Sequence, residues 1–502
     1  MTLPLRVLFL ASEADPFIKI GGLGDVAGSL PLALSQISNA IDVRLAIPLQ
    51  GEIQKRGYPL NRLRTFDIHW AEGTQWAERG RPKNGKAAAE VYSILHKGVP
   101  VYLISGEFIA PDAPVYTSDA YADGLKYTFF SLAALELARH LNWMPHIVHA
   151  NDWHTAPAVY ALSRMRDTGD FFSNTSTVLG LHNLPYLGSG AGRALAAFGL
   201  PPAYHSALPW WAQDMPLPLG LLTADHIVAV SPTYAQEILT PEFGVGLQDF
   251  LRTRSASISG ILNGLDLDRW DPQADPALLN RFDSQSLDAR VANKTALQSE
   301  FRLQEEPSAP LVAMVTRLDT QKGVDLVPEA LRLLAITPTY MDQPWQMIIL
   351  GTGDTDLERT VRGLQAEFPR RLCAVIRFDA DLSRRIFAGA DVMLIPSRYE
   401  PCGLTQMIAM RYGCVPIARA TGGLKDTVVD FNQSKDSVGF LFGEASPGAL
   451  AESLGRALQV YRDQAAWRGL QQRGMGRDFS WARSAQQYLD LYLKLSDKRR
   501  ML

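Results

Sequence analysis

Short runs of consecutive apolar residues alternate along the chain with longer stretches that have helical periodicity. A run that stays apolar at every position indicates a strand buried on both faces, which is typical of a parallel sheet covered by helices. We therefore expect helices at residues 26–37 and 125–140, between strands of a first sheet at residues 6–12, 43–47, 101–104, 147–149, 177–181 and 227–230.

The same rhythm restarts after residue 310. Two such series favour two doubly wound α/β domains, each binding ligands at the carboxyl ends of its strands. A turn-rich segment at residues 261–264 places the hinge near residue 260, and residues 481–495 have the apolar spacing of a terminal helix. Strands of the second sheet are predicted at residues 311–316, 346–350, 374–377, 392–396 and 415–418.

Composition narrows the class of function. Of the 502 residues 47% are hydrophobic and 20% are charged, as in an ordinary globular protein, and a net charge of -3 offers no basic field for nucleic acid. The three cysteines have no metal-ligand spacing and indicate a reducing, cytoplasmic location. No run approaches the ~20 apolar residues of a membrane span, and the N-terminal apolar run lacks signal-peptide features. We expect no nucleic-acid partner and no membrane partner.

A glycine-rich turn, KIGGLGD at residues 19–25, follows the first predicted strand. Glycines let a backbone approach a ligand, a helix N-terminus favours anions, and a lysine adds a point charge for phosphate. The spacing matches neither a dinucleotide fingerprint nor a Walker A loop. The segment is therefore either an anion site or a tight strand-to-helix turn.

Polar and aromatic residues follow two later strands of the first series. Residues 148–154 (VHANDWH) and 181–186 (LHNLPY) combine groups that bond sugar hydroxyls with aromatic faces that pack against a pyranose ring. The alternative is that these are satisfied core residues. A zinc site at His149 and His154 lacks a third ligand at suitable spacing.

Two loops of the second series carry charge. Arg317 and Lys322 follow its first strand, either to neutralise a diphosphate leaving group or as a solvated surface pair. Residues 396–406 (PSRYEPCGLTQ) lead into a helix predicted at residues 404–412, whose start can hold phosphate. Glu400 in this loop suits sugar or ribose hydroxyls, or is an ordinary N-terminal helix charge. Residues 351–354 and 420–424 are weaker signals of the same kind.

Together these motifs resemble the bacterial glycogen synthase and plant starch synthase family, which are retaining glycosyltransferases with two facing Rossmann-like domains (GT-B type). Order and spacing match from about residue 6 to about residue 495. The matching segments are residues 19–23 (KxGGL), 149–154 (HxxDWH), 182–183 (HN), 261–264 (IxNG), 317–323 (RLxxQKG), 400–406 (EPCGLTQ) and 479–481 (FSW).

The resemblance implies an acceptor-side domain, residues 1–260 with a terminal helix at 481–502, and a nucleotide-sugar-binding domain, residues 261–480. It also implies transfer of glucose from ADP-glucose to the non-reducing end of an α-1,4-glucan such as glycogen, with retention and with no metal or other cofactor. Three rival functions stay open. One is a related transferase that uses UDP-glucose or another acceptor, and another is a catalytically silent glucan-binding protein. The third is a nicotinamide-dependent dehydrogenase, against which the missing GxGxxG argues.

The resemblance assigns a role to each matching position. The implied catalytic residues are Glu400, His182, Arg317 and Lys322. The acceptor side is implied to include Asp152, His154 and Asn183. The implied nucleotide-sugar-binding residues are Lys19, Gly21, Gly22, Asp25, Asn263, Phe378, Cys402, Gly403, Leu404 and Thr405.

Four positions bear on how well the family pattern is kept. Ile20 replaces a frequent threonine and Asn151 a frequent histidine, and neither change removes a fixed charge, so we expect activity to persist. Phe378 stands where a tyrosine often stacks on adenine, so the stacking face is kept and the hydroxyl is lost. Ile408 leaves Glu400 as the lone carboxylate of its motif, as is usual in this family.

Overall fold

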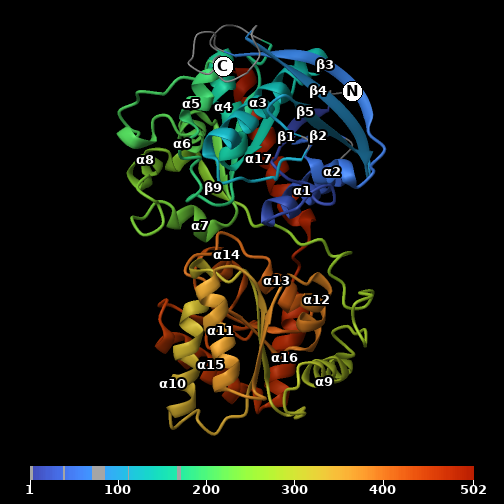
Figure 1. Cartoon of the computed structure of the whole chain (residues 1–502), viewed down its shortest axis with the longest axis vertical. Helices are drawn as coiled ribbons and strands as arrows, with labels where there is room; N and C mark the ends of the chain where they lie inside the picture. Colours follow the sequence, from blue (N-terminus) through green and yellow to red (C-terminus); the bar gives the residue numbers. More distant parts are fainter. Residues whose placement is uncertain (1–3, 38–39, 71–84, 111, 167–170, 502) are drawn as a thin grey trace. The chain divides into compact units, whose positions relative to one another are not determined.

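The computed structural model describes residues 4–37, 40–70, 85–110, 112–166 and 171–501. These residues form two compact units, Met1–Gly264 with Trp481–Leu502, and Leu265–Ser480. Each unit is an α/β structure built on one sheet that is parallel at its centre (Figure 1). The predicted fold class of two Rossmann-like domains is therefore confirmed.

The first unit has a nine-stranded sheet in the order β3-β4-β5-β2-β1-β6-β7-β8-β9. Its strands are β1 (Leu5–Leu10), β2 (Ile41–Pro48), β3 (Asn61–His69), β4 (Lys86–His96), β5 (Val99–Gly106), β6 (Ile147–Asn151), β7 (Ser176–Leu181), β8 (His226–Ala229) and β9 (Ile258–Gly260). Its helices are α1 (Gly22–Ile37), α2 (Gly51–Lys55), α3 (Ala120–His140), α4 (Asp152–Arg166), α5 (Gly192–Ala197), α6 (Pro216–Thr223), α7 (Pro232–Glu237), α8 (Gln248–Thr253) and α17 (Trp481–Met501).

The second unit has a six-stranded parallel sheet in the order β12-β11-β10-β13-β14-β15. Its strands are β10 (Leu311–Val315), β11 (Gln346–Gly351), β12 (Leu372–Ile376), β13 (Val392–Ile395), β14 (Val415–Arg419) and β15 (Phe440–Phe442). Its helices are α9 (Arg290–Glu300), α10 (Val327–Ile336), α11 (Thr355–Glu367), α12 (Ala380–Gly389), α13 (Thr405–Arg411), α14 (Gly422–Thr427), α15 (Pro447–Tyr461) and α16 (Gln464–Met475).

Strand order identifies one switch point in each sheet. β1 is followed by β2 on one side of it, whereas its other neighbour β6 is followed by β7, so the connections from these two adjacent strands leave in opposite directions. β10, followed by β11, and its neighbour β13, followed by β14, have the same arrangement in the second sheet. Open parallel sheets bind ligands at the carboxyl ends of the strands beside such a point. The loops after β1, β6, β10 and β13 are therefore the positions where chemistry is expected.

The edge of the first sheet departs from the predicted parallel pattern. β4 pairs antiparallel with both β3 and β5, and Lys97 and Gly98 close the β4–β5 turn with positive φ angles of 47° and 89°. Five of the nine residues of β3 are exposed in succession and β4 alternates between buried and exposed positions, so neither strand has a continuous apolar run. The three-residue strands β9 and β15 are too short to give such a run.

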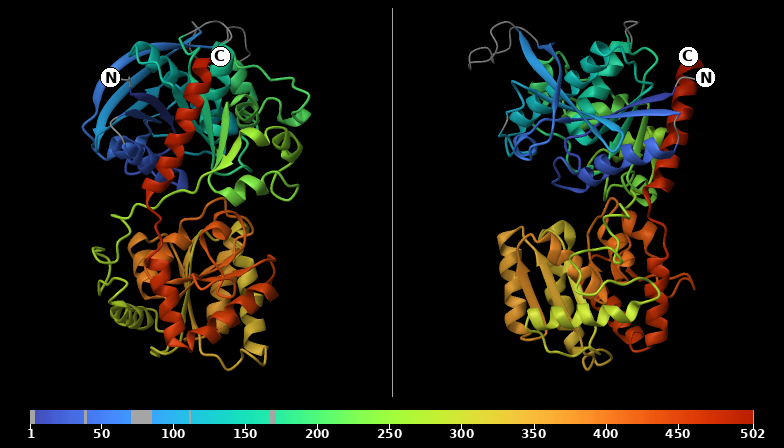
Figure 2. Two further views of the ribbon diagram at one scale, coloured as in Figure 1. Left: turned by 180° about the vertical axis from the view of Figure 1, so that it is seen from behind. Right: turned by 90° about the vertical axis from the view of Figure 1, so that its right-hand side faces the viewer.

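Helix α17 returns the end of the chain to the first unit, as Figure 2 shows in red. Its buried residues Trp481, Tyr488 and Tyr492 belong to the same core cluster as Val7 and Phe9 of β1. The outgoing and returning connections run side by side, because the Leu265 amide donates to the Phe479 carbonyl at 2.6 Å. Within the described residues, no helix combines the length and the apolar character needed to cross a membrane.

Tyr492→Phe tests how firmly α17 is bound. The Tyr492 hydroxyl and His149 Nδ1 are 2.5 Å apart in the core, and burial lowers the pKa of His149 to about 3, so the imidazole is neutral at pH 7. Loss of the hydroxyl leaves a buried ring nitrogen without its partner, so we expect the free energy of unfolding to fall by about 1–3 kcal/mol. Urea unfolding measures the change. Tyr204→Phe is the matched control because Tyr204 is 87% exposed, and an equal loss in the two variants would contradict the assignment.

Candidate functional site

A buried carboxylate organises the glycine-rich turn after β1. Glu13 is 1% exposed and accepts the backbone N–H groups of Ile20 and Gly21, the latter at 3.1 Å. The Tyr116 hydroxyl donates to its other oxygen at 2.9 Å. Burial raises the pKa of Glu13 from its ordinary value, and the N–H donors oppose that rise. Glu13 therefore holds the turn in one conformation.

The turn presents a lysine and the start of α1. Lys19 Nζ lies 2.6 Å from Asp25 Oδ1, and both side chains are partly exposed. Gly22 begins α1 and is exposed, so its backbone is open to a ligand. A Cβ atom at Gly24 would lie 3.0 Å from the Lys19 side chain and 3.1 Å from Glu13 Oε2, so a larger residue here would require these side chains to shift.

The loops after β6 and β7 are joined by Asp152. This residue has a φ angle of 53°, and its Oδ1 accepts the amides of His182 at 2.7 Å and Asn183 at 3.3 Å. His182 Nε2 lies 2.8 Å from Asn151 Oδ1, and Asn151 in turn donates to the Leu10 carbonyl of β1 at 2.8 Å. Two motifs about thirty positions apart in sequence therefore form one network.

Burial favours the neutral form of each titratable group in this network. It raises the pKa of Asp152 from 3.8 to about 7, against the two N–H bonds from His182 and Asn183 that lower it. It lowers the pKa of His182 from 6.5 to about 4. Burial also lowers the pKa of His154, whose ring packs against Trp153, Tyr116 and Tyr127. The histidines are therefore neutral hydrogen-bonding groups at pH 7.

Three of the predicted residues have a buried polar atom with no hydrogen-bond partner among the described residues. These atoms are His154 Nδ1, Asn183 Oδ1 and Asn263 Oδ1. A buried polar group left unpaired costs about 1–3 kcal/mol. Sugar hydroxyls can both donate to and accept from such atoms, so all three are suited to a carbohydrate.

In the second unit, the loops after β10 and β13 meet in an ion pair. Lys322 Nζ lies 2.7 Å from Glu400 Oε2 and 3.0 Å from Oε1, with both side chains largely buried. Ser397 Oγ donates to Glu400 Oε2 at 2.8 Å. These groups border a cavity of about 20 Å³. Its lining residues are Met314, Val315, Thr316, Lys322, Leu394, Ile395, Pro396, Ser397, Glu400 and Thr405.

Arg317 has a different environment from Lys322. Its side chain is 63% exposed, and its Nη2 lies 3.1 Å from Asp319 Oδ2. Asp319 Oδ1 also accepts the Lys322 amide at 3.0 Å and so caps the short 3₁₀ turn that carries the lysine. The structure thus provides one shielded and one solvent-facing cation on the same loop.

Close glycine packing shapes the Glu400 loop. Gly403 and Gly422 have φ angles of 72° and 44°, in the left-handed region that favours glycine. A Cβ at Gly422 would lie 2.0 Å from the Glu400 carbonyl oxygen, and one at Gly423 would lie 2.1 Å from that of Cys402. The segment 420–424, a weak signal in the sequence, therefore supports this loop. Leu404 and Thr405 follow at the start of α13, and Cys402 is buried.

Phe378 is the remaining predicted residue, and it lies in the loop after β12. Its side chain is 87% exposed, an unusual state for a large aromatic residue in a folded chain. One ring face is thus available for stacking. Across the described residues, no group of three or more His, Cys, Asp or Glu side chains has the arrangement of a metal site.

Sequence patterns missed three residues that support these loops: Glu13, Tyr116 and Ser397. Glu13 was visible as an acid directly after the first strand, which is a weak signal because most such acids are solvated. Nothing in the sequence connects Tyr116 with Glu13, since the two are 103 positions apart. Ser397 lies within the PSRYEP segment, but its bond to Glu400 depends on the conformation of the loop.

Asp152→Asn tests the raised pKa of Asp152. A carboxyl group whose pKa is higher in the folded state than in the unfolded state stabilises the fold most at low pH. That contribution to the free energy of unfolding is lost as the pH rises from the unfolded-state pKa to the folded-state pKa. We therefore expect wild type to lose up to about 1.4 kcal/mol per pH unit relative to the variant between about pH 4.5 and pH 6.5. Above about pH 8 the difference levels off. Urea unfolding of both proteins at several pH values measures it, and a pH-independent difference would contradict the burial of an ionisable group here.

Comparison with known proteins covers nearly the whole chain. The family model of the starch synthase catalytic domain matches residues 6–253, and that of glycosyl transferases group 1 matches residues 297–469. A glycogen synthase from Anaeromyxobacter sp. (strain Fw109-5) is 41% identical over 98% of this chain and 100% of its own. A glycogen synthase from Geotalea daltonii (strain DSM 22248 / JCM 15807 / FRC-32) is 38% identical over 99% and 100%.

Solved structures agree with these matches. The catalytic domain of starch synthase IV from Arabidopsis thaliana, bound to ADP and acarbose, has a TM-score of 0.85 at 31% identity and covers 98% of this chain and 100% of its own. Sucrose-phosphate synthase from Thermosynechococcus elongatus has a TM-score of 0.59 at 20% identity over 98% and 99%, which shows a shared fold. Full-length similarity and the motif loops together establish that the chain belongs to the glycogen synthase and starch synthase family of retaining glycosyltransferases.

Proposed function

We propose that the chain is a glycogen synthase, which transfers glucose from ADP-glucose to the non-reducing end of an α-1,4-glucan with retention of configuration. The observation that carries this function is the 41% identity over 98% of the chain with a protein named glycogen synthase. A starch synthase of the same fold binds ADP and acarbose. None of the three cysteines, all of which lie in described parts of the chain, forms a disulfide bond, which supports the cytoplasmic location expected from the sequence.

The second unit is proposed to bind the nucleotide sugar. As the bond between C1 of glucose and the phosphate oxygen breaks, negative charge builds on the departing diphosphate. Lys322 and Arg317 are the cations placed to neutralise that charge, one shielded and one exposed. Leu404 and Thr405 add the start of α13, and Phe378 adds an aromatic face for adenine. The cations stabilise the leaving group, so the proposal invokes no metal ion.

Glu400 is proposed to bind hydroxyls of the transferred glucose. Its two oxygens accept hydrogen bonds from Lys322 Nζ, and Oε2 also accepts one from Ser397 Oγ. When the diphosphate engages the ammonium group, the carboxylate becomes available to the sugar. Lys322 would thus bind the diphosphate of the donor and Glu400 its glucose. Cys402 and Gly403, which follow Glu400 in the same loop, would lie beside the glucose.

The first unit is proposed to supply the acceptor side and part of the diphosphate site. Lys19, Gly21 and Gly22 would contact phosphate, with Asp25 orienting Lys19 through the ion pair described above. Asp152, His154 and Asn183 would bind the glucan, and Asn263 the glucose, through their unpaired buried atoms and network bonds. We propose residues 1–260 and 481–502 as the acceptor-side domain and residues 261–480 as the nucleotide-sugar-binding domain.

Retention is proposed to occur by attack on the same face of the sugar from which the diphosphate leaves. Glu400 is the lone carboxylate of its motif, and it is already assigned to the sugar hydroxyls. The motif therefore offers no second carboxylate to act as a nucleophile. The backbone carbonyl of His182 is proposed to stabilise the positive charge on the ring, because the Asp152 bond fixes the amide of that residue. An oxygen of the leaving phosphate accepts the proton of the acceptor hydroxyl as that hydroxyl attacks C1.

Lys322→Ala and Arg317→Ala test the diphosphate site. Loss of a group that stabilises charge in the transition state typically costs about 10²–10³ in rate, so we expect kcat/KM with ADP-glucose to fall by that order for Lys322→Ala, and less for the exposed Arg317. A coupled assay of ADP release with glycogen as acceptor measures the rates. Lys55→Ala is the control, since Lys55 is an exposed lysine on α2.

The same assay separates the proposed function from its rivals. Faster turnover of UDP-glucose than of ADP-glucose would contradict the assignment of ADP-glucose as the donor and identify UDP-glucose instead. Binding of glycogen without release of ADP would identify a silent glucan-binding protein. Near-normal kcat/KM in a correctly folded Lys322→Ala variant would contradict the catalytic role of the lysine.

Phe378→Ala tests the adenine-stacking face. Stacking of an aromatic pair contributes about 0.5–1.5 kcal/mol, so we expect KM for ADP-glucose to rise about 2–10-fold with little change in kcat. Phe378→Tyr keeps the ring and should leave KM near that of wild type. Steady-state kinetics on the three proteins checks this, and equal KM values for the alanine and tyrosine variants would show that the ring face is not used.

A further inference from the structure

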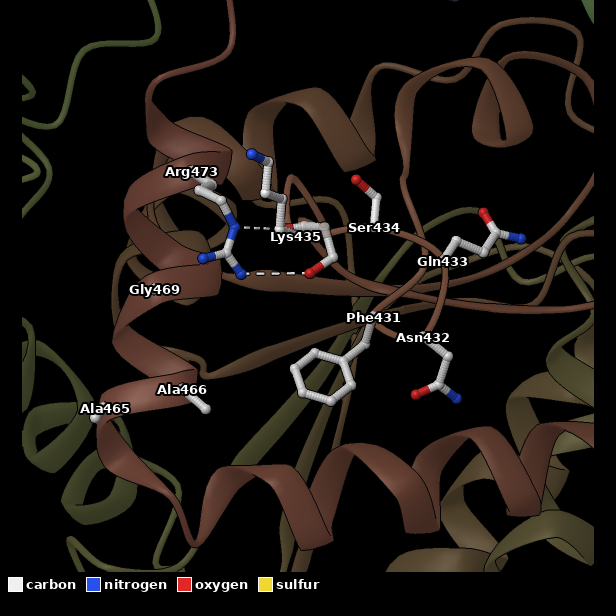
Figure 3. Close-up of a pocket in the computed structure, with 10 residues that line it drawn as sticks. Phe431, Asn432, Gln433, Ser434, Lys435, Ala465, Ala466, Gly469 and Arg473 are labelled. Carbon is white, nitrogen blue, oxygen red and sulfur yellow. Dashed lines mark hydrogen bonds between the residues drawn. The ribbon is translucent and has the colours of Figure 1, made fainter.

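A pocket of about 550 Å³ lies in the second unit, between the loop that enters β15 and helix α16 (Figure 3). This volume is in the range of about 300–1,000 Å³ that is typical of small-molecule sites. We call it the α16 pocket. It is lined by Phe431, Asn432, Gln433, Ser434, Lys435, Ser437, Ala465, Ala466, Gly469 and Arg473.

The α16 pocket shares no residue with the candidate site. The loops of that site in this unit follow strands β10, β12, β13 and β14, whereas the pocket loop leads into β15, which is the edge strand of the sheet. The small cavity beside Lys322 and Glu400 also has none of these lining residues. The pocket is therefore separate from the proposed donor site.

The charge of the pocket is one-sided. Lys435 and Arg473 both line it, and none of its ten lining residues is acidic. Within the part of the chain that the structure describes, neither cation forms an ion pair with a carboxylate. Two cations that line one pocket repel each other unless an anion lies between them. A ligand with a negative group between the two cations would offset their repulsion.

Arg473 is held in place rather than free in solvent. Its Nε donates to the Ser437 carbonyl at 2.7 Å, and its Nη2 donates to the Ser437 hydroxyl at 3.3 Å, as the dashed lines in Figure 3 show. A Cβ atom at Gly469 would lie 2.8 Å from Arg473 Nη1, so the guanidinium rests on helix α16 where the glycine leaves room. The remaining N–H groups are thus fixed at low entropic cost, as in sites that recognise phosphate.

The rest of the lining is neutral and hydrogen-bonding. Asn432, Gln433 and Ser434 supply amide and hydroxyl groups, which both donate and accept. Ala465 and Ala466 of α16 present small side chains on the opposite wall, and Phe431 is stacked on Phe440 of β15 with ring centroids 5.6 Å apart. Such a lining suits hydroxyl groups attached to the anion.

We propose that the α16 pocket is a second ligand site, which binds a small molecule that carries a phosphate group together with neutral hydroxyls. Arg473 and Lys435 bind the phosphate. Asn432, Gln433 and Ser434 bind the hydroxyls. The site is independent of the residues assigned to catalysis, so its existence does not depend on the proposed transfer reaction.

Titration of the full chain with inorganic phosphate tests the site. Calorimetry at constant ionic strength, with saturating ADP present to occupy the donor site, gives the dissociation constant. We expect Arg473→Gln and Lys435→Ala each to weaken phosphate binding about tenfold or more, because a charge-assisted bond is lost. Arg462→Gln, an exposed arginine outside the pocket, is the matched control and should bind as wild type does.

Gly469→Ala is the sharper variant because it keeps both charges. The new methyl group displaces the guanidinium from its place on the helix, while alanine favours the helix over glycine, so thermal stability should be kept or raised. We expect weaker phosphate binding with an unchanged or higher Tm. Unaltered phosphate affinity in all three pocket variants, or no phosphate binding to wild type, would overturn the proposal.

Maltose provides the second arm of the experiment. A neutral disaccharide that binds in place of phosphate, and loses affinity in the same variants, would identify a glucan site and overturn the anion assignment. Turnover of ADP-glucose on glycogen is measured separately on wild type. Its absence would contradict the proposed function and leave the phosphate result intact.

Discussion

Parallel pairing of the central strands brings the chemistry of each unit to one edge of its sheet. In a parallel sheet all carboxyl ends point the same way, so loops distant in sequence become neighbours. Lys322 and Glu400 are 78 positions apart, yet they form one ion pair because β10 and β13 are adjacent. Asp152 and His182 meet for the same reason after β6 and β7. The contacts between these residues therefore require the correct pairing of the strands that precede them.

Buried or largely buried acids then fix the loops at these edges. Glu13, Asp152 and Glu400 each sit at a strand end and each accept two or more donors. Their donors differ in kind. Glu13 and Asp152 accept backbone N–H groups, which fixes the course of the chain, whereas Glu400 accepts side-chain donors that a ligand can replace. Two of the three acids thus fix backbone conformation, whereas the third accepts hydrogen bonds from the side chains of Lys322 and Ser397.

The central part of the fold could be predicted from the sequence because burial on both faces leaves an uninterrupted apolar run. β1, β6, β10 and β13 all have this signature, and the motif loops were placed at their ends. β3 and β4 could not be predicted in this way, since one face of each is exposed and alternation replaces the run. The family and its reaction were also predictable, because they rest on short motifs whose order is preserved. The bonds of Glu13 to the turn and of Ser397 to Glu400 depend on tertiary packing, which no local pattern records.

Helix α17 makes the first unit discontinuous along the chain, with Leu265–Ser480 inserted before its last element. A ribosome releases residues in order, so the core that contains Trp481 and Tyr492 lacks α17 until residues 481–501 have been synthesised. The inserted unit has all its strands in one uninterrupted stretch and can complete its sheet while synthesis continues. The second unit can therefore be complete before the first, and a chain that stops before residue 481 would carry the second unit attached to a first unit that lacks α17.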